Sequence, residues 1–147
     1  MPSTVAFLTS LIKPIPGENP SGRWVKYEDV YDLIQAARVE DDPSLPQGVW
    51  KRDLKEADWK TIERLAITTL ENQSKDLQIA AWLTEAWLQL NGIRGLNKGF
   101  LLIQTLTDRF WETLYPDLSD IEFRLRPFEW INEKISQRLR LYPISAV

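Results

Sequence analysis

The chain of 147 residues contains no cysteine and no histidine. Without cysteine it has no disulfide, no thiolate nucleophile and no cysteine-ligated zinc site. Without histidine it lacks the usual general base near neutral pH and the Ser-His-Asp and Cys-His arrangements that activate nucleophiles. These two absences exclude many classes of enzyme, and we expect a protein that is not an enzyme.

A strong net charge is also missing. Eighteen Lys and Arg stand against twenty-one Asp and Glu, which gives a formal charge of −3. Nucleic-acid binding depends on a strongly basic surface, so we expect no nucleic-acid partner. No apolar run reaches the roughly 18 residues that cross a bilayer, and residues 1–11 lack the basic start of a signal peptide. The sequence therefore predicts a soluble, cytoplasmic protein without membrane insertion.

Acidic and glycine-rich segments offer no convincing metal or cofactor site. The acidic run at residues 40–42 lacks the spacing of a calcium loop. Gly92, Gly95 and Gly99 follow a helical segment rather than a strand, so they fit a helix end and a helix start better than a phosphate loop. We expect no catalytic residue, no metal and no cofactor. One enzyme alternative, a carboxylate-dependent hydrolase of cell-wall sugars, would need two carboxylates about 5–10 Å apart across a cleft.

Apolar residues make up 44% of the chain and recur at helical spacing, while no segment alternates like a strand. The spacing predicts a short first helix around residues 5–12 and longer ones over 27–39, 59–70, 75–90, 95–114 and 126–141. The length suits one core. The sequence therefore predicts an all-α fold, a single domain over residues 1–147 that forms a compact bundle of about six helices with Pro/Gly-rich connecting loops. Because no terminal element follows Pro143, we expect this domain to be the N-terminal part of a longer protein.

The segment 75–90 is apolar on nearly all sides, and Gln78, Glu85 and Gln89 form one narrow polar stripe. This pattern is typical of the central helix of a bundle. Ser74 is the predicted N-cap, with Asp76 in the first turn. For the helix at 59–70, Asp53 or Asp58 lies near the predicted start.

Seven tryptophans are distributed over the chain. Those on the apolar stripes are predicted to fill the core: Trp50, Trp59, Trp87 and Trp111. Trp24, Trp82 and Trp130 lie off the stripes, Trp82 at the edge of one, so we expect them to be at least partly exposed and treat them as candidate partner contacts.

The loop at residues 14–22 contains three prolines and two glycines and is too stiff for a helix or a central strand. A rigid connector is the favoured interpretation, but its low conformational entropy would also suit docking. Its central residues are therefore further candidate contacts: Pro16, Gly17, Glu18, Asn19 and Pro20.

Five segments carry a resemblance to a known family. They are Pro-Ile-Pro-Gly-Glu-Asn-Pro-Ser-Gly at 14–22, Ala-Ala-Arg-Val-Glu-Asp-Asp at 36–42, the helix that starts Ser-Lys-Asp-Leu at 74–77, Phe-Trp with Leu-Tyr-Pro at 110–116, and Glu-Trp-Ile-Asn at 129–132. In this order they resemble the N-terminal domain of the ImpA/TssA family of bacterial type VI secretion proteins. Ile131 departs mildly from the leucine that is usual there, and the C-terminal regions that build ring-shaped oligomers are missing.

The resemblance implies a non-enzymatic part of the type VI secretion machine. It implies association with the baseplate and with the growing tail, where TssA proteins coordinate assembly of the inner tube and the contractile sheath. Related proteins with this domain anchor the distal end of the sheath, and a purely structural self-association domain is a further alternative. The expected partners are protein components of the machine (baseplate, sheath or tube), with a possible homo-oligomer. The resemblance carries over no catalytic residue.

Overall fold

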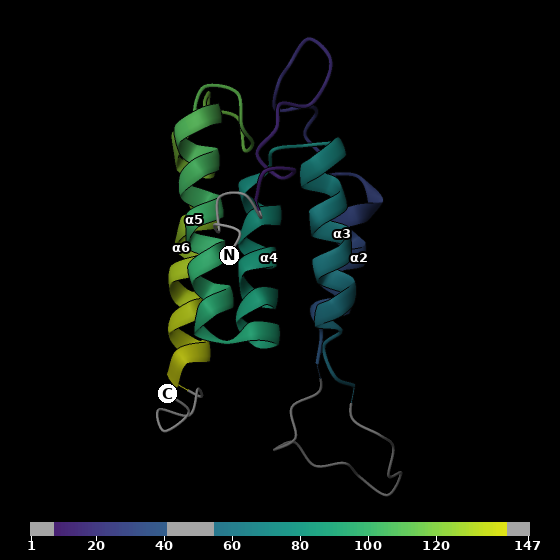
Figure 1. The fold of residues 1–147 in the computed structure, drawn as a ribbon, viewed down its shortest axis with the longest axis vertical. Coiled ribbons are helices and arrows are strands. Elements are labelled where there is room, and N and C mark those ends of the chain that lie inside the picture. The colour runs from purple at the N-terminus through teal and green to yellow at the C-terminus, as the bar shows by residue number, and fades with distance from the viewer. Residues whose placement is uncertain (1–7, 41–54, 141–147) are drawn as a thin grey trace, which may run out of the picture.

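The computed structural model describes residues 8–40 and 55–140 (Figure 1). This part of the chain contains five helices: α2 (Asp29–Arg38), α3 (Trp59–Asn72), α4 (Leu77–Asn91), α5 (Ile93–Phe110) and α6 (Ile121–Arg140). It contains no strand beyond two isolated bridges, which confirms the predicted all-α class. The count of about six stays a prediction, because the first helix falls partly outside the described residues. Its described end is a turn in which Leu11 N and Ile12 N donate to Leu8 O.

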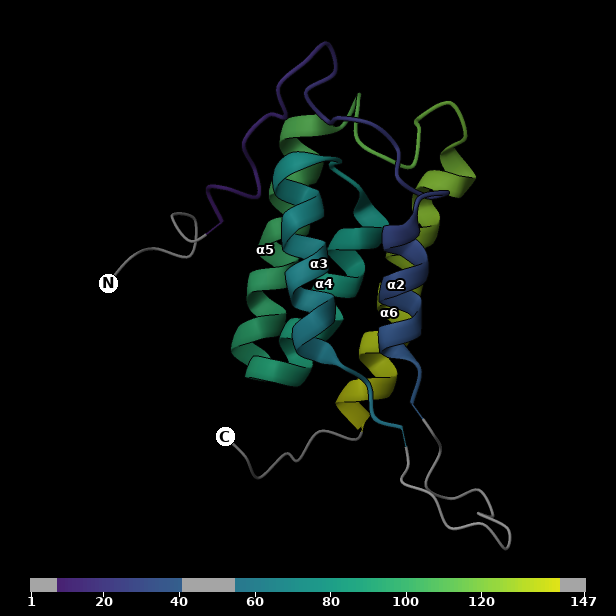
Figure 2. The same cartoon turned by 90° about the vertical axis from the view of Figure 1, so that its right-hand side faces the viewer.

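Helix α4 lies at the centre of the bundle, as predicted. It packs against α3, α5 and α6, while α2 packs against α3 (Figures 1 and 2). Trp87 on α4 is fully buried, as expected, and donates from its indole nitrogen to Glu63 of α3. The expectation that Trp82 is partly exposed was wrong, because its side chain is only 4% exposed. The ring of Tyr31 from α2 packs edge-on against it, at 5.0 Å between ring centres.

The N-cap predictions were confirmed for α3 and wrong for α4. Asp58 caps α3 by accepting from Thr61 N, whereas Asp53 lies outside the described residues. Asp76, not Ser74, caps α4, and its carboxylate accepts from the first amides of the helix. Ser74 stands outside the helix because it pairs instead with Gly22 in an isolated bridge.

Two glycines that were predicted to start a helix lie inside α5. A Cβ on Gly95 would stand 2.0 Å from the carbonyl oxygen of Trp87, and one on Gly99 would stand 2.4 Å from the Thr84 side chain. Their small size lets α5 approach α4 closely. Phe100 is 45% exposed, because it lies about a quarter turn away from this glycine face.

Helix α6 begins five residues earlier than predicted, after Asp120, whose side chain accepts from Phe123 N. Pro127 therefore lies inside the helix and not in its first turn, so the Phe123 carbonyl lacks the usual partner four residues on. Ile131 and Ile135 are buried as predicted. Leu139 is exposed, because the end of α6 extends beyond its neighbours (Figure 1).

The predictions for the remaining tryptophans had different outcomes. The prediction that Trp111 fills the core was wrong, because the helix ends at Phe110 and the turn that follows leaves the Trp111 side chain 38% exposed. Trp59 is partly buried against the core, and Trp50 lies outside the described residues. No helix of the described residues is both long and apolar enough to cross a membrane.

Candidate binding groove

The loop at residues 14–22 is held against the start of α4 and the turn after α5. Ser21 O accepts from Lys75 N at 2.8 Å, and Gln73 O accepts from Arg23 N at 3.1 Å. On the other side of the same segment, Tyr115 N donates to Lys75 O and Leu77 N donates to Tyr115 O. We call residues 19–23, 73–77 and 111–116 the motif junction. It joins three of the segments that carry the family resemblance.

Side chains complete the motif junction. The Tyr115 hydroxyl accepts from Asn19 Nδ2 at 3.2 Å and donates to Gly22 O at 2.9 Å, next to a cis peptide bond between Tyr115 and Pro116. Gly22 is required there, because its φ is +74° and a Cβ would stand 2.1 Å from Gln73 O. Lys75, fully buried, donates from Nζ to Leu11 O at 2.7 Å and Leu70 O at 2.6 Å.

Arg124 of α6 holds the third part of the motif junction. Its guanidinium is fully buried and donates to the carbonyls of Trp111, Leu114 and Pro116. All three carbonyls belong to the segment that follows α5. The arginine therefore fixes the path of the chain between α5 and α6.

Burial shifts the pKa values of the titratable groups in and beside the motif junction. Burial raises the pKa of Asp76 to about 6, although the Tyr31 hydroxyl, at 2.6 Å, and two amides favour its charged form. The pKa of Tyr31 is raised, first by burial and then by the charge of Asp76. Burial lowers the pKa of Lys75 to about 8.

The loop residues proposed as contacts are therefore of two kinds. Asn19 is used by the motif junction, since its side chain bonds to Tyr115 and to Ser21 N. The other four are exposed: Pro16, Gly17, Glu18 and Pro20. The hydrogen bonds agree with the favoured role as a rigid connector, and docking by the exposed residues stays a prediction.

A groove of about 460 Å³ opens between α2, α4 and α6. Figure 1 shows α4 between α6 on one side and α2 on the other. The groove is lined by residues of all three helices and of the segments before α2 and α6: Trp24, Lys26, Tyr31, Gln35, Arg38, Val39, Gln78, Trp82, Pro116, Phe123, Arg126, Pro127 and Trp130. It thus brings together all three tryptophans that the sequence analysis selected. Trp82 forms part of its buried wall, whereas Trp24 and Trp130 are partly exposed.

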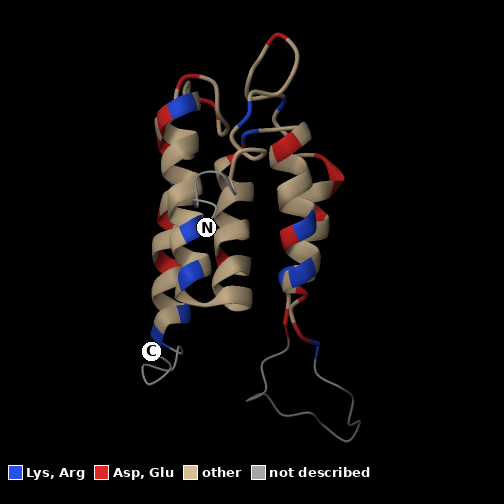
Figure 3. Cartoon of the chain, viewed as in Figure 1, with Lys and Arg blue, Asp and Glu red and all other residues tan. Residues whose placement is uncertain are grey.

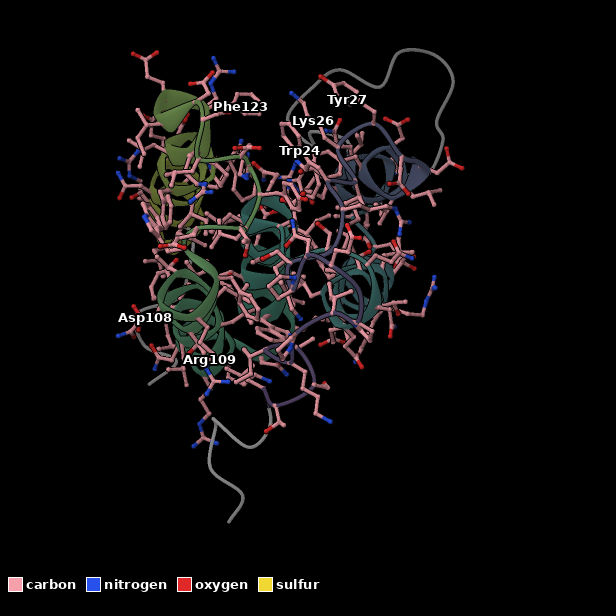
Figure 4. All side chains as sticks on the ribbon, turned by 90° about the horizontal axis from the view of Figure 1, so that it is seen from above. Trp24, Lys26, Tyr27, Asp108, Arg109 and Phe123 are labelled. Carbon is pink, nitrogen blue, oxygen red and sulfur yellow. The ribbon has the colours of Figure 1, made fainter. Side chains whose placement is uncertain are left out.

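Aromatic rings and cations alternate at one end of the groove (Figure 4). Trp24 stacks on Tyr115 with ring centres 6.0 Å apart and meets Phe123 edge-on at 5.6 Å. Lys26 Nζ lies 4.1 Å from the centre of the Phe123 ring, and the Arg126 guanidinium lies 5.0 Å from it. Cations are attracted to aromatic faces, so both charges are held beside one ring.

A buried carboxylate ties the three helices together at the other end. Glu85 of α4 is fully buried and accepts from Arg38 of α2 at 2.6 Å and from Arg138 of α6 at 3.4 Å. The Arg38 guanidinium also lies 4.8 Å from the centre of the Trp130 ring. The predicted polar stripe of α4 is thus real, but at Glu85 it faces two arginines instead of solvent.

The charge of the groove differs from that of the whole chain. Among the described residues, its lining contains three cations, Lys26, Arg38 and Arg126, and no carboxylate. Elsewhere Figure 3 shows both signs along the helices. Glu85 neutralises Arg38, whereas Lys26 and Arg126 form no ion pair with any residue that the structure describes. In the described ranges, no group of three or more acidic side chains could hold a metal ion, and residues 41 and 42 lie outside them.

A buried polar atom without a partner also lies in the groove. Three buried side-chain atoms of the described residues have no hydrogen-bond partner: Trp24 Nε1, Ser74 Oγ and Gln78 Nε2. Gln78 and Trp24 both line the groove, but the Trp24 indole also interacts with the Tyr31 hydroxyl and favours its charged form, so Gln78 Nε2 is the donor that is left unused. A buried donor without an acceptor is costly, so such atoms mark positions where a ligand can supply one.

Sequence reasoning missed most of the polar lining, including Lys26, Gln35, Arg38, Gln78 and Arg126 as contacts. The available signal was the interleaving of aromatic and basic residues at 23–27 and at 123–126. These segments are about 100 residues apart in the chain, and only the packing of α2 and α6 on α4 brings them together.

Residues 12–133 match the family described as ImpA, N-terminal, type VI secretion system. The chain belongs to this family. The resemblance predicted from the five segments is thereby confirmed, and the ImpA N-terminal family is a family of type VI secretion components.

Two relatives extend this result. The chain is 27% identical over 121 residues to the type VI secretion system component TssA1 of Pseudomonas aeruginosa, which covers 78% of this chain and 34% of that protein. It also matches a solved structure of the N-terminal domain of the TssA component from Burkholderia cenocepacia, which includes the conserved ImpA N-terminal region. The TM-score is 0.76 at 36% identity, over 92% of this chain and 50% of that one. The chain thus spans about one third of the curated relative and half of the solved one.

Proposed function

We propose that the chain is a non-enzymatic, cytoplasmic protein-interaction domain of a TssA-like protein, with a role in baseplate association and in assembly of the tail tube and sheath. Family membership supports the place in the secretion machine. The relatives are longer than this chain, which supports the proposal that residues 1–147 are the N-terminal domain of a longer protein.

The groove between α2, α4 and α6 carries the interaction role. It combines large aromatic surfaces, two cations that form no ion pair with a described residue, and the buried Gln78 donor, which has no acceptor among those residues. Tryptophan and arginine are the residue types that contribute most at protein interfaces. The groove lining holds no pair of carboxylates, so it gives no support to the hydrolase alternative.

Capture of purified sheath, tube and baseplate components on the immobilised chain tests the proposal. We expect at least one of them to bind, and to bind the longer protein less well when this domain is deleted. If none binds the chain alone or within the longer protein, the interaction role is wrong. Retention of the sheath alone would favour the distal sheath-anchoring alternative.

Self-association is the second candidate, and one feature of α6 favours it. Ile121 and Leu125, one helical turn apart, are 48% and 42% exposed. If this pair forms a contact between copies, Leu125→Glu should convert a dimer into a monomer in sedimentation velocity without weakening component capture. A chain that is monomeric at all concentrations would exclude this alternative.

A further inference from the structure

We infer that the groove binds an acidic peptide segment that carries one or two large apolar side chains. This inference rests on the proposed interaction role and adds the chemistry of the partner. It is carried by three observations on the described residues: the charges at one end of the groove, the donor in its wall, and the apolar surface between them.

The two cations at one end of the groove favour an acidic partner. Lys26 and Arg126 lie against the same Phe123 ring, from the segment before α2 and from α6. Their positive charges reinforce each other there, and neither forms an ion pair with a carboxylate of the described residues, although Glu122 and Glu129 lie one helical turn from Arg126 on α6. A carboxylate placed at this end would contact both side chains, and a second one a helical turn away would still lie within the Debye length of about 10 Å. A basic segment would be repelled by the same two groups.

The donor in the wall of the groove favours a partner with acceptors. Gln78 lines the groove, and its Nε2 has no hydrogen-bond partner among the described residues, whereas Trp24 Nε1, also in the lining, interacts with the Tyr31 hydroxyl. Gln78 and Trp24 are each partly exposed, so a modest rotation of the Gln78 amide would present its N–H groups to a ligand. Carboxylate oxygens and peptide carbonyls are the acceptors that an acidic peptide supplies.

The apolar surface between the two ends of the groove favours a partner with a large apolar side chain. Trp82 and Trp130 form the wall beside Val39 and Pro127, between the cations at one end and the Arg38–Glu85 pair at the other. A volume of about 460 Å³ lies within the range of sites that enclose small ligands, and it admits a bulky side chain such as Leu, Phe or Trp.

A peptide selection tests the inference. A random 12-residue displayed library is selected on the 147-residue chain, and the recovered peptides are synthesised and titrated by fluorescence anisotropy. We expect enrichment of Asp and Glu together with Leu, Phe or Trp. The double variant Lys26→Glu, Arg126→Glu should bind the same peptides at least tenfold more weakly. Recovery of basic or uncharged peptides, or of none, would overturn the inference.

Arg109→Glu controls for a change of charge away from the groove; it matches the single variant Arg126→Glu in size and half of the change in the double variant. Arg109 is exposed at the end of α5 and lies away from Trp24 and Phe123 in Figure 4. We expect this variant to bind the selected peptides like the unmodified chain. Equal loss in both variants would mean that net charge, not the groove, attracts the peptides, and a dT12 oligonucleotide that binds as tightly as the peptides would also count against a peptide site.

Gln78→Leu separates ligand binding from folding. Removal of a buried donor without a partner should leave the thermal midpoint unchanged or raise it. Peptide affinity should fall several-fold, because the leucine cannot donate. An unchanged affinity would show that the Gln78 amide does not contribute to peptide binding.

The two proposals fail in different ways. If the charge-reversed groove still captures a secretion component at full strength, the interaction role stands and the groove is not its site. If peptides bind the groove as expected but no secretion component does, the chemistry of the groove stands and the proposed function is wrong.

Discussion

The motif junction and the groove lie next to each other and share Pro116, yet they differ in how their polar groups are used. At the motif junction, the charged groups of Lys75 and Arg124 donate hydrogen bonds to backbone carbonyls. The Tyr115 hydroxyl both accepts and donates a hydrogen bond. In the groove, Lys26 and Arg126 form no ion pair with a carboxylate of the described residues, and Gln78 Nε2 has no acceptor among them. Segments that carry the family resemblance contribute to both regions, since Arg38, Pro116 and Trp130 line the groove, so the two regions differ in the partners of their polar groups and not in their origin in the chain.

Arg124 and Arg126 show the difference within one turn of α6. Arg124 is fully buried and bonds three carbonyls, whereas Arg126 is exposed and faces the groove beside Phe123. Both are arginines in a basic stretch of one helix. Their separate roles come only from what packs against each side of that helix.

The largest expected effect comes from Arg124→Ala. Three buried carbonyls would lose a charged donor, and each hydrogen bond to a charged group contributes about 1.5–3 kcal/mol. Because such losses are not additive, we expect unfolding to become easier by about 3–5 kcal/mol in a urea titration. Arg126→Ala, as the control, should change stability by less than about 0.5 kcal/mol. Similar losses of stability in the two variants would show that the buried and the exposed arginine contribute equally to the fold, which would contradict the difference between the two regions.

A second effect concerns pH. Lys75 keeps its proton in the unfolded chain up to about pH 10.5, but in the fold only up to about pH 8. The unfolded state therefore holds more protons between these values, so the free energy of unfolding must rise as pH rises through that window. We expect a gain of about 2 kcal/mol between pH 8 and pH 9.5, since one pKa unit corresponds to about 1.4 kcal/mol.

Denaturant titrations across this pH range measure the gain, and Lys75→Met provides the control. The substitution removes the titrating group, so the rise with pH should disappear even if the variant is less stable overall. A flat profile in the unmodified chain would show that the two carbonyls at Lys75 Nζ hold its proton despite burial.

The smallest effect is expected at the tip of the loop. Glu18 is exposed, and the structure gives it no ion pair with any described residue. Glu18→Ala should change the thermal midpoint by less than about 1 °C, in line with surface substitutions in general. It should also leave component capture unchanged. Loss of capture without loss of stability would show that the loop docks a partner, as its stiffness first suggested.

Local signals in the sequence predicted much of this fold. The apolar stripes found the five described helices, the continuous stripe identified α4 as central, and Asp58 was expected near the start of α3. The predictions that were wrong depend on contacts between helices. Trp82 and Glu85 are buried because side chains of α2 and α6 cover the polar side of α4, and no local sequence pattern predicts this contact.

The candidate site was predicted in part. Helical spacing placed Trp24, Trp82 and Trp130 off the apolar stripes, and the structure brings them into one groove. Helical spacing did not identify Lys26 or Arg126. A single cation on the surface is common, and only the fold brings these two side chains close together. Trp82→Ala would remove a buried ring and destabilise the fold, so charge reversal at the rim of the groove is the cleaner test.

The most direct measurement compares three chains against the secretion component that the unmodified chain captures: the unmodified chain, Lys26→Glu with Arg126→Glu, and Arg109→Glu. Affinity and thermal midpoint are determined for each. Binding by the groove predicts at least a tenfold loss for the double variant alone, with all three midpoints within a few degrees. Equal affinity of all three chains would contradict the assignment of the groove as the binding surface.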